Sequence, residues 1–335
     1  MAGYAETRTW DVLLTTTLGA LERKIVDQIT DQYAFTSWLT GGRVSNLLRG
    51  VKGSDAYDNR EGGESIEVRV WYGLGGTAAS RAYTAQTLTT PKDGATLGRF
   101  NWKYYSDSIV VFQEELDRNS GDAQVVNLLE FKIKQSTMAL RDLFNGDAFG
   151  TNGDGGTALN GMGNIVDSAG TAGGLAAATF TWWAADENAA SPTSFAANGI
   201  EEMRKLWVDL AAIGSTPEII VTSPSVYTWY EARLFNQTRF IPRNDAMIGA
   251  DPAFTNAVFH TVPVIFDKDE TNNHMFMVNA QSLRLTVLRN KLFKVTPFES
   301  SISDGQNAKV ALVEASCEMT TPHRRGNGKI TGFVA

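Results

Sequence analysis

The longest amphipathic pattern in the chain runs from Asp122 to Gly150. Apolar positions recur there every three or four residues, which is the spacing of one helix face. The first stripe is Val125, Leu129, Ile133, Ser136, Leu140 and Leu143, and a second row is Val126, Phe131, Met138 and Phe144. Candidate N-caps and upstream acids favour a helix start here: Asn119, Ser120 and Asp122, preceded by Glu114, Glu115 and Asp117. The pattern predicts a spine helix of about 25 residues and about 38 Å.

A second pattern predicts a long β-hairpin. Apolar and polar residues alternate from Ser65 to Tyr72 and again from Gly98 to Val111, as in half-buried strands. In the second segment Phe100, Trp102 and Tyr104 are expected on the face opposite Arg99 and Lys103. The connection between the strands is far longer than the 2–5 residues that a tight hairpin needs. An isolated two-stranded hairpin is marginally stable in water, so its excess length suggests a partner.

The first 40 residues have no core of their own. A helix-like stripe is followed by three aromatic residues: Leu13, Leu14, Leu18, Leu21, Ile25 and Ile29, then Tyr33, Phe35 and Trp38. Such an arm must lie on another surface, either on its own domain or on a neighbouring subunit. Residues 43–63 that follow are polar.

The remainder of the chain alternates loops, helices and strands. Residues 150–195 are rich in Gly, Ala, Asn and Thr and predict a meandering loop with short strands. Residues 195–290 predict a sheet covered by helices: helices at Phe195–Ile213 and Ser225–Phe235, and strands at Glu218–Thr222, Val262–Phe266, Met275–Val278 and Leu283–Leu288. From Ala308 to Met319 one face is continuously apolar, which predicts a central strand with Cys317 buried on it.

Composition narrows the function classes. The 335 residues are 43% apolar, which allows a substantial core, and the net charge of −7 argues against a protein held to nucleic acid by phosphate contacts. A single cysteine excludes an internal disulfide. The N-terminus has no signal-peptide pattern and no run approaches a membrane span. We therefore expect a soluble intracellular protein.

No constellation of residues predicts catalysis or a cofactor. The three histidines, His260, His274 and His323, lack metal-ligand spacing, and the glycine-rich loop lacks a phosphate-binding motif. Asp147, Asn152 and Asp154 lack the spacing of a calcium loop. His323, Arg324 and Arg325 form a small basic cluster, interpreted as a solvated turn or as a contact to acids of a neighbouring subunit.

Two segments carry a family resemblance. Glu114–Gly153, EELDRNSGDAQVVNLLEFKIKQSTMALRDLFNGDAFGTNG, resembles the spine-helix region of tailed-phage major capsid proteins. Val295–Gly332, VTPFESSISDGQNAKVALVEASCEMTTPHRRGNGKITG, resembles their closing region. The order of parts is also similar to that family. The resemblance implies an α+β fold, the HK97-like capsid fold, with four parts: an N-terminal arm and linker (1–63), an E-loop hairpin (64–112), a peripheral domain (113–195 and 290–335, spine helix 122–149) and an axial domain (196–289).

The resemblance also implies a function. Copies would form hexamers and pentamers of an icosahedral phage head around double-stranded DNA, with no enzymatic activity and no cofactor. The alternative is an encapsulin-type shell protein that holds cargo. Some relatives carry an N-terminal scaffolding extension of roughly a hundred residues, so here we expect a separate scaffolding protein or an already mature chain. A portal protein and a decoration protein are further expected partners.

Contacts between subunits are expected on the hairpin and on the basic cluster. The hairpin candidates comprise charged residues on the strands and apolar residues at the tip, and the basic cluster adds two arginines. These candidates are Glu67, Arg69, Leu74, Tyr83, Leu88, Arg99, Lys103, Arg324 and Arg325. Exposed ion pairs contribute at most about 1 kcal/mol each, so the charges would set register more than strength.

Overall fold

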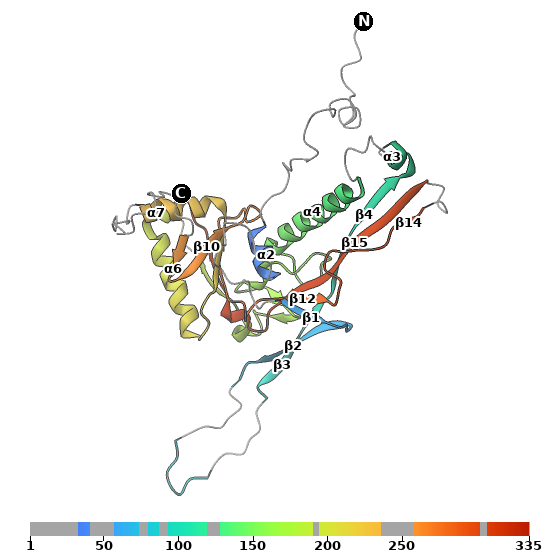
Figure 1. The fold of residues 1–335 in the computed structure, drawn as a ribbon. Coiled ribbons are helices and arrows are strands. Elements are labelled where there is room, and N and C mark those ends of the chain that lie inside the picture. The colour runs from blue at the N-terminus through green and yellow to red at the C-terminus, as the bar shows by residue number, and fades with distance from the viewer. Residues whose placement is uncertain are drawn as a thin grey trace, which may run out of the picture. The chain divides into compact units, whose positions relative to one another are not determined.

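The computed structural model describes residues 33–40, 57–73, 80–86, 93–118, 128–189, 194–235, 257–301 and 307–334. These residues form two compact units. Figure 1 labels their helices and strands. Among them, unit 1 takes residues 104–118, 128–143, 290–301 and 307–315, and unit 2 takes the others. The boundary between the units falls within one long helix and one long strand, α4 and β15.

Unit 2 contains a mixed sheet with the strand order β7-β16-β11-β8-β10-β9. Its strands are β7 (Asp186–Ala189), β8 (Ile219–Thr222), β9 (Ala257–Phe259), β10 (Val262–Phe266), β11 (Met275–Val278) and β16 (Gly328–Thr331). Every residue of β8 and β11 is buried, so both faces of the sheet centre are covered. The predicted strands β8, β10 and β11 are confirmed.

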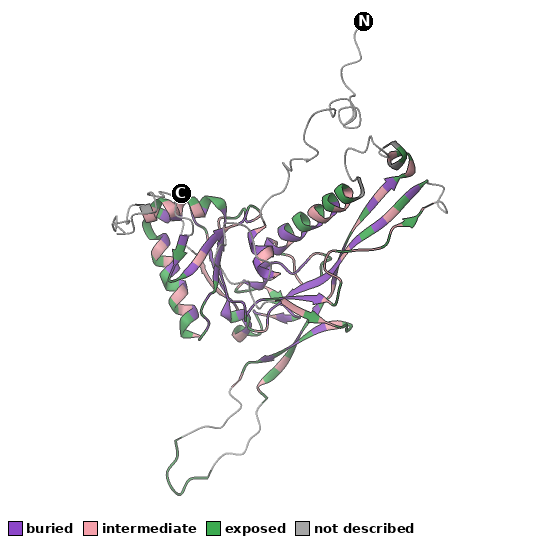
Figure 2. Cartoon of the chain, in the orientation of Figure 1, coloured by how far each residue is buried: buried purple, intermediate pink, exposed green. Residues whose placement is uncertain are grey.

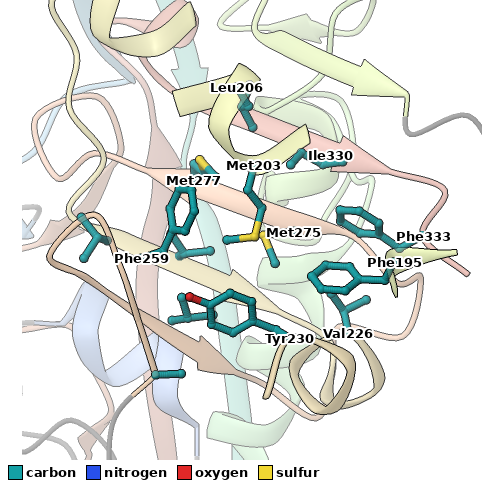
Figure 3. Packing of buried hydrophobic residues seen from close by; sticks show 14 of the residues in the cluster. Phe195, Met203, Leu206, Val226, Tyr230, Phe259, Met275, Met277, Ile330 and Phe333 are labelled. Carbon is teal, nitrogen blue, oxygen red and sulfur yellow. The ribbon is translucent and has the colours of Figure 1, made fainter. Parts of the chain in front are cut away.

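Two helices, α6 (Phe195–Ala212) and α7 (Pro224–Phe235), pack on this sheet, as predicted. Both helices start at a serine: the Ser194 hydroxyl accepts from the Ala196 N–H, and the Ser223 hydroxyl from the Val226 N–H. Figure 3 shows their core, in which Met203 and Leu206 of α6 meet Met275 and Ile330 of the sheet.

A second sheet is built around β15 (Ala308–Thr320). In unit 2, β12 (Arg284–Leu288) pairs with residues 317–320 of β15 and with β1 (Tyr57–Arg60). The expectation that this strand belongs with β8, β10 and β11 is therefore wrong, because its partner β15 recruits it to another sheet. Cys317 is fully buried on β15, as predicted, with Val313 and Met319.

Unit 1 holds the other partners of β15 and most of the spine helix. Residues 308–315 of the strand pair with β13 (Lys294–Val295) and β14 (Glu299–Ser300), and β4 (Lys103–Phe112) also pairs with β15. A short helix, α3 (Gln113–Arg118), follows β4. Glu115 of α3 forms an ion pair with Lys132 of the spine helix. The acidic segment therefore makes a side-chain contact with the spine helix.

The spine helix is α4 (Leu128–Phe149), and its predicted end is confirmed. The predicted start at Asp122 lies outside the described residues. The predicted face is wrong in part: Leu143 is 54% exposed and Phe131 is 41% exposed. The buried residues of α4 are instead Ser136, Leu140, Phe144, Asn145, Ala148 and Phe149, which recur every three to four positions. Because each residue turns the helix by about 100°, Leu143 points well away from Phe144.

A short helix from the N-terminal arm packs on its own subunit. In α2 (Ala34–Leu39), Phe35 and Leu39 are fully buried. The Phe35 ring lies 5.2 Å from the Phe149 ring, and its N–H donates to the Asp267 carboxylate at 3.3 Å. The first of the two interpretations of the arm is therefore confirmed for this part. The stripe from Leu13 to Ile29 lies outside the described residues.

The glycine-rich segment is a compact meander, as predicted. It contains α5 (Met162–Ile165), β5 (Thr171–Ala172), β6 (Leu175–Ala176) and the 3-10 helix η3 (Thr181–Trp183). At its start Gly161 packs against Gly150, where an added Cβ would lie 2.0 Å from the Gly150 carbonyl oxygen. The close approach of these two backbones requires glycine.

Replacing Gly161 by alanine is therefore expected to lower the free energy of unfolding by at least the 1–3 kcal/mol that is roughly typical of overpacking. The matched control is Gly146→Ala in α4, where an added Cβ meets nothing within 4 Å. That change is expected to stabilise the subunit by up to about 1 kcal/mol, because alanine is the better helix former. Urea unfolding of both variants checks this, and equal midpoints would contradict the packing described.

Candidate inter-subunit surface

The predicted hairpin is formed by β2 (Ser65–Trp71) and β3 (Ala95–Asn101). Its inner face carries Ile66, Val68, Val70 and Phe100, which pack with Ala172, Leu175 and Trp183 of the meander. Figure 2 shows buried and exposed residues alternating along both strands. The alternation predicted for β2 is thus confirmed, and the meander supplies the cover that the hairpin lacks by itself.

The outer face of the hairpin carries charge and exposed apolar area. Glu67 lies opposite Arg99, with 3.5 Å between the Glu67 carboxylate and the Arg99 Nε. Arg69 lies opposite Leu97 and has no ion-pair partner among the described residues. Trp71 is 76% exposed. A groove of about 740 Å³ runs beside this face, lined by Arg69, Ala95, Thr96, Leu97, Arg99, Gly173, Gly174 and Leu175.

The hairpin tip is described in part. Tyr83 is fully exposed, and its ring therefore has no cover from the described part of its own chain. Leu74 and Leu88, the other two predicted contact residues at the tip, lie outside the described residues.

Lys103 is not on the outer face. The chain leaves the hairpin at Trp102, where the strand is interrupted between β3 and β4. This single residue reverses the alternation, so Lys103 is buried and Tyr104 is 72% exposed, opposite to the prediction. The Lys103 ammonium donates to the backbone carbonyls of Asp154 and Gly156. Lys103 therefore anchors the meander at the root of the hairpin and has no exposed charge to offer a neighbour.

Glu318 of β15 lies beside Lys103, with 4.0 Å between the carboxylate and the ammonium. One carboxylate oxygen accepts from the N–H groups of Asn160 and Met319, and the other is buried and has no hydrogen-bond partner among the residues that the structure describes. Burial raises the pKa of Glu318 to about 8, against the lowering effects of the Asn160 N–H and Lys103. The sequence analysis missed this residue, although a glutamate inside an apolar strand was a usable signal.

Arg324 and Arg325 have different environments. Arg324 is fully buried and donates to three carbonyls of the meander, those of Asn164, Ile165 and Gly170. Burial lowers its pKa to about 10. The interpretation of this cluster as a solvated turn is therefore wrong for Arg324, whose partners come from a segment distant in sequence. Arg325 is exposed and stays a candidate contact.

The described residues contain no group of three His, Cys, Asp or Glu that could hold a metal ion. Asp154, one of the residues considered for calcium, accepts from the Asn160 side chain and the Gly174 N–H. None of the helices described is both long and apolar enough to cross a membrane.

Several solved structures are similar to this chain, whereas no protein-family model and no curated protein matches it. A chain of the cyanophage A-1(L) capsid is 14% identical with a TM-score of 0.70, covering 96% of this chain and 99% of that one. A chain of the capsid of an empty GTA particle is 14% identical with a TM-score of 0.56, and the match covers 93% of this chain and 96% of that one. The holo-SrpI encapsulin of Synechococcus elongatus PCC 7942 is 9% identical with a TM-score of 0.51, covering 92% of each chain.

These likenesses extend over nearly the whole chain. At such low identity they concern the fold. The chain has the HK97-like fold of phage capsid proteins.

Proposed function

We propose that this chain is a major capsid protein, the structural subunit of an icosahedral phage head that encloses double-stranded DNA. The observation that carries the proposal is the match to the cyanophage A-1(L) capsid chain, which extends over 96% of this chain and 99% of that one. Copies assemble into hexamers and pentamers and are part of the virion. The subunit is not an enzyme and needs no cofactor.

The parts of the chain take the roles that the fold suggests. Residues 64–112 are the E-loop, residues 113–195 and 290–335 the peripheral domain, and residues 196–289 the axial domain. Contacts between subunits use Glu67, Arg69, Leu74, Tyr83, Leu88 and Arg99 of the hairpin together with Arg325. Lys103 and Arg324 are excluded from this set because both are buried against carbonyls of their own chain.

The partners follow from the same proposal. A separate scaffolding protein and a portal protein take part in assembly, and the packaged DNA is held without sequence-specific contacts. A decoration protein is a further partner, supported by a similar structure of phage G in which major capsid proteins occur with decoration proteins.

Electron microscopy of the purified protein tests the proposal. The protein is imaged alone and together with a lysate of phage-producing host cells, which supplies scaffolding protein. We expect capsomers, closed shells or tubes. A monomer at all protein and salt concentrations, also with scaffolding protein, would overturn it. Shells that contain a cargo enzyme instead of DNA would indicate the encapsulin alternative, which the SrpI likeness keeps open.

A further inference from the structure

One edge of β3 is unpaired at the root of the hairpin. The opposite edge pairs with β2, whereas on this edge the Arg99 N–H donates to the Gly173 carbonyl at 2.9 Å. Backbone groups of alternate residues in a strand point to the same edge, so Ala95 and Leu97 point there too. Neither has a backbone partner on this edge within the part of the chain that the structure describes. An unpaired strand edge is a template for another strand.

The groove beside this edge is positively charged. Arg69 and Arg99 both line it, and of the two only Arg99 has a carboxylate nearby in the described chain, that of Glu67. Arg69 carries an unneutralised guanidinium next to Leu97, its register partner on β3. An extended segment with a carboxylate fits this chemistry, because the backbone edge supplies hydrogen bonds and the guanidinium binds the acid.

The same chain carries a strand of matching character. β14 (Glu299–Ser300) pairs with β15, and among the described strands it has no partner on its other side. Both residues of β14 are exposed, and Glu299 has no ion-pair partner among the described residues. β14 is thus an edge strand with a free carboxylate.

We propose that the β3 edge of one copy pairs with β14 of a second copy, and that Arg69 binds Glu299 across this junction. The inference rests on the proposed function, because it requires copies of the chain side by side in a shell. It specifies which strand of the neighbour receives the hairpin and which charges fix the register.

A disulfide cross-link tests the pairing. Neighbouring strands bring Cα atoms about 4.5–5.5 Å apart, within the range of a disulfide. Arg69 and its register partner Leu97 lie on one face of the hairpin, and successive side chains of a strand alternate, so Glu299 and not Ser300 lies on that face. Assembled shells of the variant Leu97→Cys/Glu299→Cys are expected to give a ladder of covalent oligomers under mild oxidation. Cys317 does not compete because it is fully buried. The matched control is Leu97→Cys/Val310→Cys, since Val310 lies beside Glu299 but one strand further in. A ladder that is equal in the two variants, or absent from both, overturns the pairing.

Exchanging the charges tests the ion pair. Arg69→Glu and Glu299→Arg are each expected to raise the protein concentration needed for assembly by up to about fivefold, the equivalent of one exposed ion pair. The double variant is expected to restore the original concentration. Two single effects that add up without rescue overturn the Arg69–Glu299 contact. If shells form normally in all variants, this inference fails and the proposed function stands, whereas failure of the unmodified protein to form shells removes both.

Discussion

Replacing Gly75–Thr90 by a short Gly-Ser turn is expected to leave a folded subunit and to abolish shells. The inner face of the hairpin keeps its cover, because Ile66, Val68 and Phe100 pack on the meander. The tip itself offers Tyr83, which is fully exposed. Burying a large apolar side chain on a neighbour contributes about 1.5–3 kcal/mol, repeated around each closed capsomer. Circular dichroism measures whether the subunit is still folded, and electron microscopy measures whether shells form.

The control for this deletion is a Gly-Ser segment of unchanged length in the same place. This control removes the side chains of the tip but keeps the length of the hairpin, so it distinguishes the effect of the side chains from the effect of shortening. If side chains carry the contact, both variants fail to form shells, and Tyr83→Ala weakens assembly on its own. Shells of unchanged thermal stability from the shortened variant would show that residues 64–112 are not an assembly element.

The second large effect concerns the pH dependence of stability at Glu318. Its pKa is about 8 in the folded chain, above the ordinary glutamate value of about 4.5, so the unfolded state loses this proton first as pH rises. Glu318 therefore costs stability progressively from about pH 4.5 to pH 8. At about 1.4 kcal/mol per pKa unit, the loss amounts to a few kcal/mol. Glutamine does not titrate, so Glu318→Gln avoids this loss. The free energy of unfolding of the variant is therefore expected to rise relative to that of the natural subunit as pH rises.

Urea unfolding of the two proteins between pH 5 and pH 9 measures this difference. Comparing them isolates Glu318, because other buried carboxyls such as Glu270, whose pKa burial raises to about 7, titrate in both. Glu314→Gln is the matched control on the same strand, at a half-buried position paired with Lys291. Parallel pH profiles for the natural protein and Glu318→Gln would contradict the environment described for this carboxylate.

Periodicity correctly predicted the elements that bury one continuous face, at every second residue in a strand or every third or fourth residue in a helix. The end of α4, the strands β2, β8, β10, β11 and β15, and the helices α6 and α7 all lie where alternation or helical spacing placed them. Local chemistry agrees with these bounds, since Ser194 and Ser223 cap α6 and α7, and Gly214, with a positive φ of 83°, follows the end of α6. Local rules suffice for these elements because each buries one continuous face.

The predictions were wrong where contacts with residues distant in sequence determine whether a side chain is buried. One interrupting residue, Trp102, reversed the inside and outside of the next strand and buried Lys103. Arg324 is buried because carbonyls about 160 positions earlier satisfy its guanidinium. Local pattern contains no information on either contact. The unpaired edge of β3 likewise depends on how far the meander covers it, which no spacing in the sequence encodes.

The docking of α2 has a consequence for everything that precedes it. Phe35 and Leu39 are fully buried on their own subunit, and the Phe35 N–H is bound to the Asp267 carboxylate. The chain is therefore attached to its own subunit at this point. Pulling on the N-terminus of the chain would load α2 and its contacts with Asp267 and Phe149 before it loads either sheet.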